Sequence, residues 1–147
     1  MKNAIDCLVS GRIASMDLSE KGFWFATRAS CECDHVLIRF VDRTETVLVS
    51  AKDCALHVEL LKTMEQCRYI YRFIPREELA FIRLSYDERI PACLKLRYGD
   101  GYLFISASDD WLTMSVGHYD ITGEDATDIP EYEDAELELW KIKEGSI

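Results

Sequence analysis

Short runs in which apolar and polar residues alternate, joined by turn-forming residues, constrain the fold of this chain more than any other feature. In Cys93–Tyr98, Leu94 and Leu96 alternate with basic residues. A Gly-Asp-Gly sequence then separates this run from the apolar run Tyr102–Ser106. Alternation places one face of a strand in water and the other in the core, and an Asp-Gly pair supplies the positive φ angles of a tight turn. The pattern predicts an antiparallel hairpin.

A second hairpin is predicted upstream of the first. Val36–Val41 and Thr46–Val49 are rich in β-branched residues and are separated by a short stretch of turn-forming residues. A helix start is expected at Pro75–Glu78, because proline and acidic residues favour it. Leu79–Tyr86 could continue this helix or form a strand, and we favour a single turn followed by a strand. Further strands are expected at Ile5–Ala14, Gly22–Ala29, Arg68–Ile74, Trp111–Gly117 and Glu136–Ile142.

One amphipathic helix is predicted near residues 51–66. The residues from Ser50 to Asp53 have the form of a capping box. The apolar residues that follow share one helical stripe: Leu56, Leu60, Leu61, Met64 and Cys67. Because strands follow one another and one helix packs on them, we expect an α+β domain of mainly antiparallel β-sheet. It should have about eight short strands, arranged as a half-barrel or a sandwich.

The composition indicates one globular domain without a membrane span or an export signal. The 147 residues, 48% of them hydrophobic, are expected to form a single domain over 1–147, with an acidic loop near 120–135. Asp6 and Arg12 interrupt the N-terminus before any signal-peptide h-region. We therefore expect a cytoplasmic protein, whose six cysteines are free thiols and not disulfides.

Three sequence clusters resemble parts of metal or catalytic sites, and we favour a structural interpretation of each. Cys31, Cys33 and His35 lie at alternate positions, but the second pair of ligands that zinc requires is missing. Cys54 would lie in the first turn of the predicted helix, where a thiolate is favoured, but we favour helix packing as the reason for this cysteine. Asp120–Asp125 has carboxylates without the order of a calcium loop. We expect no cofactor, no metal and no enzymatic activity.

Negative charge is concentrated near the C-terminus. The net charge is −10, and nearly all of it comes from nine carboxylates between Tyr119 and Trp140, a stretch without Lys or Arg. Such a block stays hydrated unless a positive surface meets it. The candidate partner-binding residues are Tyr119, Asp120, Glu124, Asp125, Asp128, Glu131, Tyr132, Glu133 and Asp134. The acidic charge disfavours direct binding to nucleic acid and to anionic lipid.

These features favour a small acidic binding protein that occludes a basic protein partner. An immunity protein or inhibitor of a nuclease-like toxin works in this way, because a nucleic-acid site must be electropositive. The alternatives are a small-molecule-binding β-domain, closed around a pocket, and an enzyme that uses Cys and His. Pairing of the acidic residues with Arg68, Arg72 and Arg76 would count against the favoured function.

Overall fold

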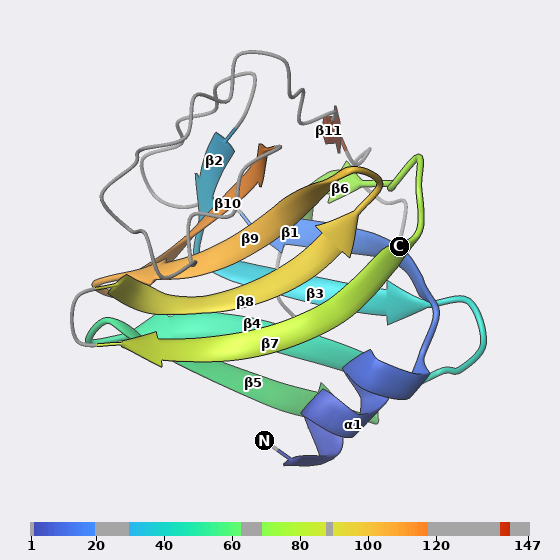
Figure 1. Cartoon of the computed structure of the whole chain (residues 1–147), viewed down its shortest axis with the longest axis horizontal. Coiled ribbons are helices and arrows are strands. Elements are labelled where there is room, and N and C mark those ends of the chain that lie inside the picture. Colours follow the sequence, from blue (N-terminus) through green and yellow to red (C-terminus); the bar gives the residue numbers. More distant parts are fainter. Residues whose placement is uncertain (1, 20–29, 63–68, 88–89, 118–138, 142–147) are drawn as a thin grey trace.

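The computed structural model describes residues 2–19, 30–62, 69–87, 90–117 and 139–141, which form two stacked antiparallel sheets and one short helix (Figure 1). Sheet A has the strand order β11 (Leu139–Lys141), β6 (Tyr69–Phe73), β1 (Ile13–Ser19), β3 (His35–Phe40), β4 (Thr46–Lys52) and β5 (Ala55–Leu61). Sheet B has the order β2 (Ser30–Cys33), β10 (Trp111–Gly117), β9 (Gly101–Ser108), β8 (Ile90–Tyr98) and β7 (Leu79–Asp87). The expected antiparallel β-fold is confirmed, and of the two expected arrangements the described strands adopt the open sandwich.

Both predicted hairpins are confirmed. Val36 of β3 pairs with Val49 of β4, and Leu94 of β8 pairs with Ile105 of β9. The positive φ in the second turn belongs to Gly99, at 57°, and not to the Asp-Gly pair that the sequence suggested. A Cβ atom at this glycine would also overlap the carboxylate of Glu77. The positive φ is what favours glycine here, because the exposed Glu77 side chain can move away from a Cβ atom.

The connection between β6 and β7 carries the chain from sheet A to sheet B. The expected strand after it is confirmed as β7, but residues 74–78 contain no helical turn. The backbone N–H of Arg76 donates a hydrogen bond to the hydroxyl of Tyr98 at 2.9 Å. The ring of Tyr98 in turn packs edge-on against Phe73, with a centroid separation of 5.7 Å. These contacts hold the connection against the end of the β8–β9 hairpin.

The helix predicted near residues 51–66 is wrong. Strand β4 continues to Lys52, and Asp53 and Cys54 then form a tight turn with φ angles of 52° and 63°. Positive φ at both central residues is the pattern of a type I′ hairpin turn. The apparent capping box is therefore the end of a strand and the start of a hairpin.

Leu56, Leu60 and Leu61 of that predicted helix belong instead to strand β5, while Met64 and Cys67 lie outside the described residues. Leu56 and Val58 are buried, while His57 and Glu59 are exposed. This alternation has the period of two that a half-buried strand requires. The spacing of Leu56 and Leu60 fits both a helical stripe and one face of a strand. Pairing with β4 along the whole of β5 shows that the segment is a strand.

The described helix lies at the N-terminus, where the sequence suggested the strand Ile5–Ala14. Helix α1 spans Lys2–Ser10, and its buried residues Ala4, Cys7 and Leu8 have the i, i+3, i+4 spacing of a helical face. The backbone N–H of Gly11 donates to the carbonyl of Cys7 at 2.7 Å and ends the helix. In Figure 1, α1 lies across the open side between the edge strands β5 and β7, and it contacts both of them. The helix thus covers one open side of the sandwich.

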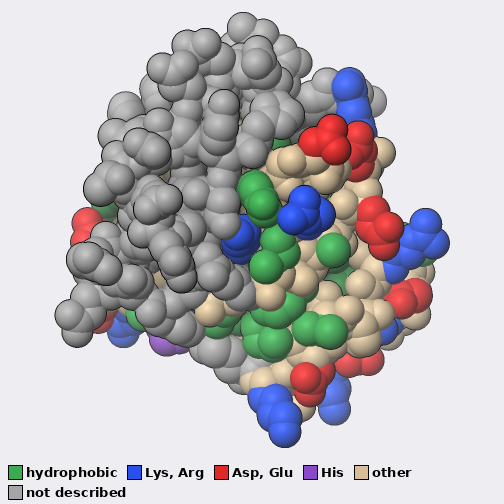
Figure 2. Space-filling model, viewed as in Figure 1, with side chains coloured by type: hydrophobic (Ala, Val, Ile, Leu, Met, Phe, Trp, Pro, Cys, Tyr) green, Lys and Arg blue, Asp and Glu red, His purple; other side chains and the backbone are tan. Residues whose placement is uncertain are grey.

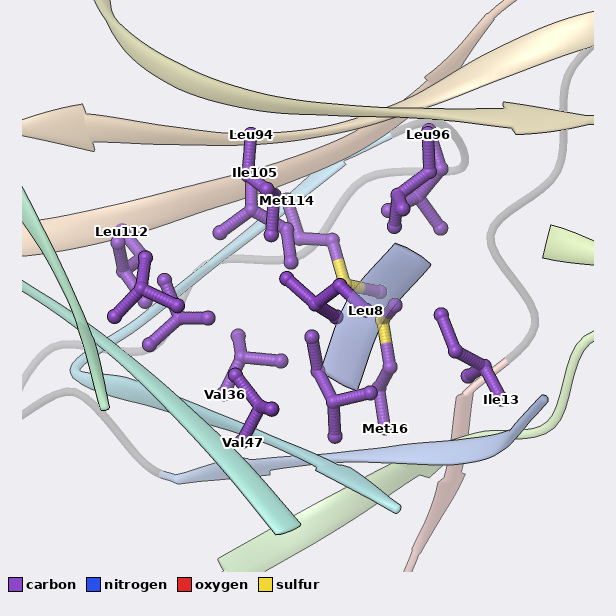
Figure 3. Close-up of a cluster of buried hydrophobic side chains, with 14 of the residues drawn as sticks. Leu8, Ile13, Met16, Val36, Val47, Leu94, Leu96, Ile105, Leu112 and Met114 are labelled. Carbon is purple, nitrogen blue, oxygen red and sulfur yellow. The ribbon is translucent and has the colours of Figure 1, made fainter. Parts of the chain in front are cut away.

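The core fills the space between the two sheets. Figure 3 shows part of it, with Met16 and Val36 from sheet A and Ile105 and Met114 from sheet B in one cluster. All four side chains are fully buried, and Leu8 of α1 joins the same cluster. The two sheets and the helix are therefore held together by one continuous apolar core.

Candidate functional site

The partner-binding residues predicted from the sequence lie outside the described residues, so the structure does not place any of them. These are Tyr119, Asp120, Glu124, Asp125, Asp128, Glu131, Tyr132, Glu133 and Asp134. The strands on either side are described. Strand β10 ends at Gly117 in sheet B, and β11 begins at Leu139 in sheet A. The two ends of the acidic segment are therefore fixed on different sheets.

A charged cluster that we call the Asp17 cluster lies on the outer face of sheet A, and it consists of Asp17, Arg39 and Arg72. The register places Arg72 of β6 directly opposite Asp17 of β1. On the other side of β1, Leu37 of β3 lies opposite Asp17, and Arg39 follows two residues later. Residues that are paired across antiparallel strands share a face. Three adjacent strands therefore bring these three side chains to one place.

One carboxylate joins the two guanidinium groups. Arg72 Nε donates to Asp17 Oδ1 at 2.6 Å, and Arg72 Nη2 donates to Oδ2 at 3.1 Å. Arg39 Nε donates to the same Oδ2 at 2.9 Å. The Asp17 residue is 1% exposed, while the arginine side chains remain 28% (Arg39) and 35% (Arg72) exposed. The buried acid is thus satisfied by three charge-assisted hydrogen bonds, and its hydrogen bond with Arg72 raises the pKa of that guanidinium.

The electrostatic balance of the Asp17 cluster is positive, since two cations share one anion. Among the described residues, Arg39 donates from Nε alone, and its two Nη groups are not engaged. Arg72 likewise leaves Nη1 unengaged among those residues. The cluster consists of one carboxylate and two guanidinium groups. The guanidinium N–H groups that remain unengaged can donate hydrogen bonds to an anion.

Sequence reasoning missed Asp17 and Arg39 and misjudged the partner of Arg72. The only partner that the sequence suggested for Arg72 was the acidic block, whereas its carboxylate partner in the structure is Asp17 of β1. A signal was present in the sequence. Asp17 stands between Met16 and Leu18 within an apolar strand, and a charge in such a position needs a partner when its face is covered.

The outer face of sheet B also contains a buried charge. Lys95 of β8 is 5% exposed, and its ammonium lies 4.5 Å from the centroid of the Tyr102 ring. The guanidinium of the exposed Arg97 lies 5.1 Å from the same ring. On the side shown in Figure 2, hydrophobic side chains gather in the middle of the described part, and most acidic and basic side chains lie around its rim. The ring of Tyr102 therefore contacts two cationic side chains on this face.

The Cys31–His35 cluster has a structural role. Cys31 and Cys33 are buried residues of β2 in sheet B, and His35 begins β3 in sheet A after one intervening residue. Burial raises the pKa of Cys31 to about 12, and it also raises the pKa of Cys33 well above the ordinary range. A protonated thiol is a poor metal ligand and a poor nucleophile. Within the described ranges, no three His, Cys, Asp or Glu side chains are grouped so that they could hold a metal ion.

Cys54 is exposed, and it lies in a turn, not in the first turn of a helix. Its backbone N–H donates to the carbonyl of Asp109 at 2.8 Å. The adjacent Asp53 N–H donates to Asp110 Oδ1 at 2.9 Å. The Cys54 thiol lies 3.6 Å from Asp109 Oδ1, and Asp109 also has a positive φ of 53°. These contacts join the β4–β5 turn to the β9–β10 turn, and they give Cys54 a role in holding the two sheets together.

The five cysteines in the described part of the chain are all free, as the sequence suggested. No helix within these ranges is long and apolar enough to cross a membrane. Comparison with known proteins identified no relative, because no family model, curated protein or solved structure matches this chain.

Proposed function

We propose that this protein is a small acidic binding protein that occludes a basic protein partner, in the manner of an immunity protein or an inhibitor of a nuclease-like toxin. The observation that carries the proposal is the separation of charge along the chain. Nine carboxylates and no Lys or Arg lie between Tyr119 and Trp140, while the remainder of the chain is close to neutral. A surface of this kind attracts a partner whose own site is positive.

The scaffold suits this role in two ways. The acidic segment leaves from Gly117 of β10 and returns at Leu139 of β11, so both of its ends are tied to strands. Loops on rigid scaffolds commonly carry recognition. In addition, the cation of Arg72, which could have neutralised the segment from within, is already paired with Asp17.

The chemistry of the proposed contact combines charge with aromatic anchors. Asp120, Glu124, Asp125 and the acids that follow would meet Lys and Arg side chains that otherwise bind phosphate. Tyr119 and Tyr132 would supply the apolar contact area that often dominates the affinity of an interface. Association should therefore be fast at low salt and should weaken as salt is raised.

The test compares two variants with the same change in net charge. The first neutralises four residues of the acidic segment: Asp125→Asn, Asp128→Asn, Glu131→Gln and Glu133→Gln. The control neutralises four exposed acids of the scaffold instead: Asp6→Asn, Glu59→Gln, Glu78→Gln and Asp100→Asn. Immobilised wild-type protein is used to capture partners from the source lysate at low and high salt. The affinity of each variant for the purified captured protein is then measured by calorimetry.

The proposal expects one basic protein to be captured near stoichiometric amounts. Its affinity should fall at least tenfold for the segment variant and change little for the scaffold variant. Equal loss in both variants would mean that only net charge matters, and the assigned site would be wrong. A partner that is acidic, or one whose binding resists 0.5 M salt and both variants, would contradict the proposal.

A further inference from the structure

We propose that the Asp17 cluster is a binding site for an oxyanion group, either a carboxylate or a phosphate, on the outer face of sheet A. Two guanidinium groups converge there on a single carboxylate, and both remain about one-third exposed. All three residues lie in the described strands β1, β3 and β6. The inference goes beyond the acidic segment and its partner, because it assigns a second surface of opposite charge.

Asp17 fixes the two arginines so that donors remain for a ligand. Arg39 uses only Nε on the carboxylate, and Arg72 uses Nε and Nη2. A guanidinium carries five N–H donors in a rigid planar fork, and this fork matches the paired oxygens of carboxylate and phosphate groups. Because Asp17 itself is buried and held from both sides, the forks are oriented before any ligand arrives. Such preorganisation lowers the entropy lost on binding.

The net charge of the Asp17 cluster also favours the binding of an anion. A cluster of two cations and one anion keeps one uncompensated positive charge at a half-buried position, and this is unfavourable unless solvent or an anion offsets it. A structural ion pair would need only one arginine for Asp17, and Arg72 alone already engages both of its oxygens. The second arginine therefore contributes more to attracting an anion than to satisfying the acid.

A hydroxyl group lies beside the same site. Ser15 is paired with Arg39 across β1 and β3, and it is buried among the polar residues of β1. A serine hydroxyl can donate a hydrogen bond to an anion. Ser15, Arg39 and Arg72 would then surround the bound group, with Asp17 behind them as the positioning residue.

The test is a titration of the full-length protein by two-dimensional NMR, with sodium acetate as the carboxylate probe and methyl phosphate as the phosphate probe. Sodium chloride holds the ionic strength constant, because simple screening also shifts resonances. The backbone amides of β1, β3 and β6 and the arginine Nε–H signals report on the site. Arg39→Gln removes one fork and leaves the paired contacts of Arg72 to Asp17 in place. Arg97→Gln removes the same charge from the outer face of sheet B and is the matched control.

The proposal expects saturable shifts at Asp17, Arg39 and Arg72 with at least one probe, and the stronger probe identifies the source of the oxyanion. Affinity should fall at least tenfold in Arg39→Gln and less than twofold in Arg97→Gln. Arg39→Lys should also bind at least fivefold more weakly, because lysine keeps the charge but not the fork. Linear shifts equal to those of chloride in the wild-type protein would overturn the proposal whether or not a variant folds. Equal affinity in Arg39→Gln would also overturn it.

Discussion

Among the described residues, the outer face of each sheet contains one buried charge, and the contacts described for these two charges differ in kind. On sheet A, the carboxylate of Asp17 accepts directional hydrogen bonds from two arginines. On sheet B, the ammonium of Lys95 lies over the ring of Tyr102. Hydrogen bonds to a buried charge are strong, and leaving such a charge without them is expensive. A cation–ring contact is weaker and tolerates small displacements. The two sheets should therefore respond unequally to loss of their partners.

The largest effect is expected for Asp17→Ala, because it leaves two neighbouring guanidinium groups without their shared anion. Removal of one member of a buried ion pair costs about 3–5 kcal/mol. Both arginines can partly rehydrate, so we expect the free energy of unfolding to fall by about 3 kcal/mol, near the lower end of this range. Urea unfolding followed by circular dichroism measures this change.

The matched control for this variant is Asp42→Ala. Asp42 also pairs with an arginine, Arg43, at 3.4 Å, but it is exposed. Exposed ion pairs contribute little to stability, because water and salt screen them. If Asp17→Ala were no more destabilising than Asp42→Ala, the Asp17 cluster would stabilise sheet A no more than an exposed ion pair does. The proposed difference between the two outer faces would then be wrong.

The turns of the two sheets offer the second test. Sheet B uses Gly99 in its β8–β9 turn, whereas sheet A uses two non-glycine residues with positive φ in its β4–β5 turn. Gly99→Ala should cost about 1–2 kcal/mol, because a Cβ atom is unfavourable in the left-handed region and because it would displace Glu77. The adjacent Asp100→Ala, at an exposed residue without a positive φ, should change the unfolding free energy by less than about 0.5 kcal/mol. Equal effects of the two substitutions would show that Gly99 is not required.

A smaller effect is expected for Tyr102→Leu, which keeps an apolar side chain but removes the ring beneath two cations. The free energy of unfolding should fall by about 1 kcal/mol, in the middle of the range for cation–π contacts. Arg97→Gln should cost less, because this arginine is exposed. A loss for Tyr102→Leu as large as that for Asp17→Ala would contradict the proposed difference between the two outer faces.

The smallest effect near neutral pH concerns the thiols between the sheets. The pKa of Cys31 is about 12 in the folded protein, whereas an unfolded thiol ionises near pH 8.5. Between these values the unfolded state loses its proton and the folded state keeps it. The unfolding free energy should therefore be unaffected below about pH 8 and should fall as pH rises toward 12, by up to about 1.4 kcal/mol per pH unit for this thiol.

Urea unfolding between pH 8 and 10.5 measures this fall. In Cys31→Ala the slope should be smaller than in the wild-type protein, although the variant is less stable overall. In Cys54→Ala, which removes an exposed thiol, the slope should match that of the wild-type protein. Identical slopes in all three proteins would show that Cys31 does not ionise on unfolding.

Sequence patterns were sufficient for elements that are decided locally. The hairpins at Val36–Val49 and Cys93–Ser106 combine alternation with turn residues, and both were predicted correctly. Strands β7 and β10 were also expected close to their observed bounds. In these segments the apolar residues fit only the two-residue period of a strand, so local propensity and the pairing between strands agree.

Two segments were misread because their residues fit more than one period. Leu56, Leu60 and Leu61 satisfy a helical stripe, and only pairing with β4 shows that they form a strand. At the N-terminus, Ala4, Cys7 and Leu8 have the spacing of a helical face. The other apolar residues around them made the segment fit a strand as well. Tertiary contacts decide such cases, and they are invisible to a local pattern.

The Asp17 cluster could not be predicted, because its members lie far apart in the sequence and meet only through strand order. Asp17 and Arg72 are 55 positions apart and are neighbours because β6 pairs with β1. The predicted acidic site stays a prediction, since its residues lie outside the described part of the chain. Charge segregation indicated a partner class there, but it does not provide geometry.

The strand order of sheet A also has a consequence for synthesis on the ribosome. Asp17 meets its first arginine only 22 residues later, within a sheet that β1, β3, β4 and β5 can assemble from the N-terminal part of the chain. Its second arginine emerges much later, 55 residues after Asp17. At roughly 5–20 residues per second, this delay lasts a few seconds or more. A sheet of β1, β3, β4 and β5 formed in that interval would leave the edge of β1 unpaired until β6 is made, and β6 precedes the acidic segment in the chain.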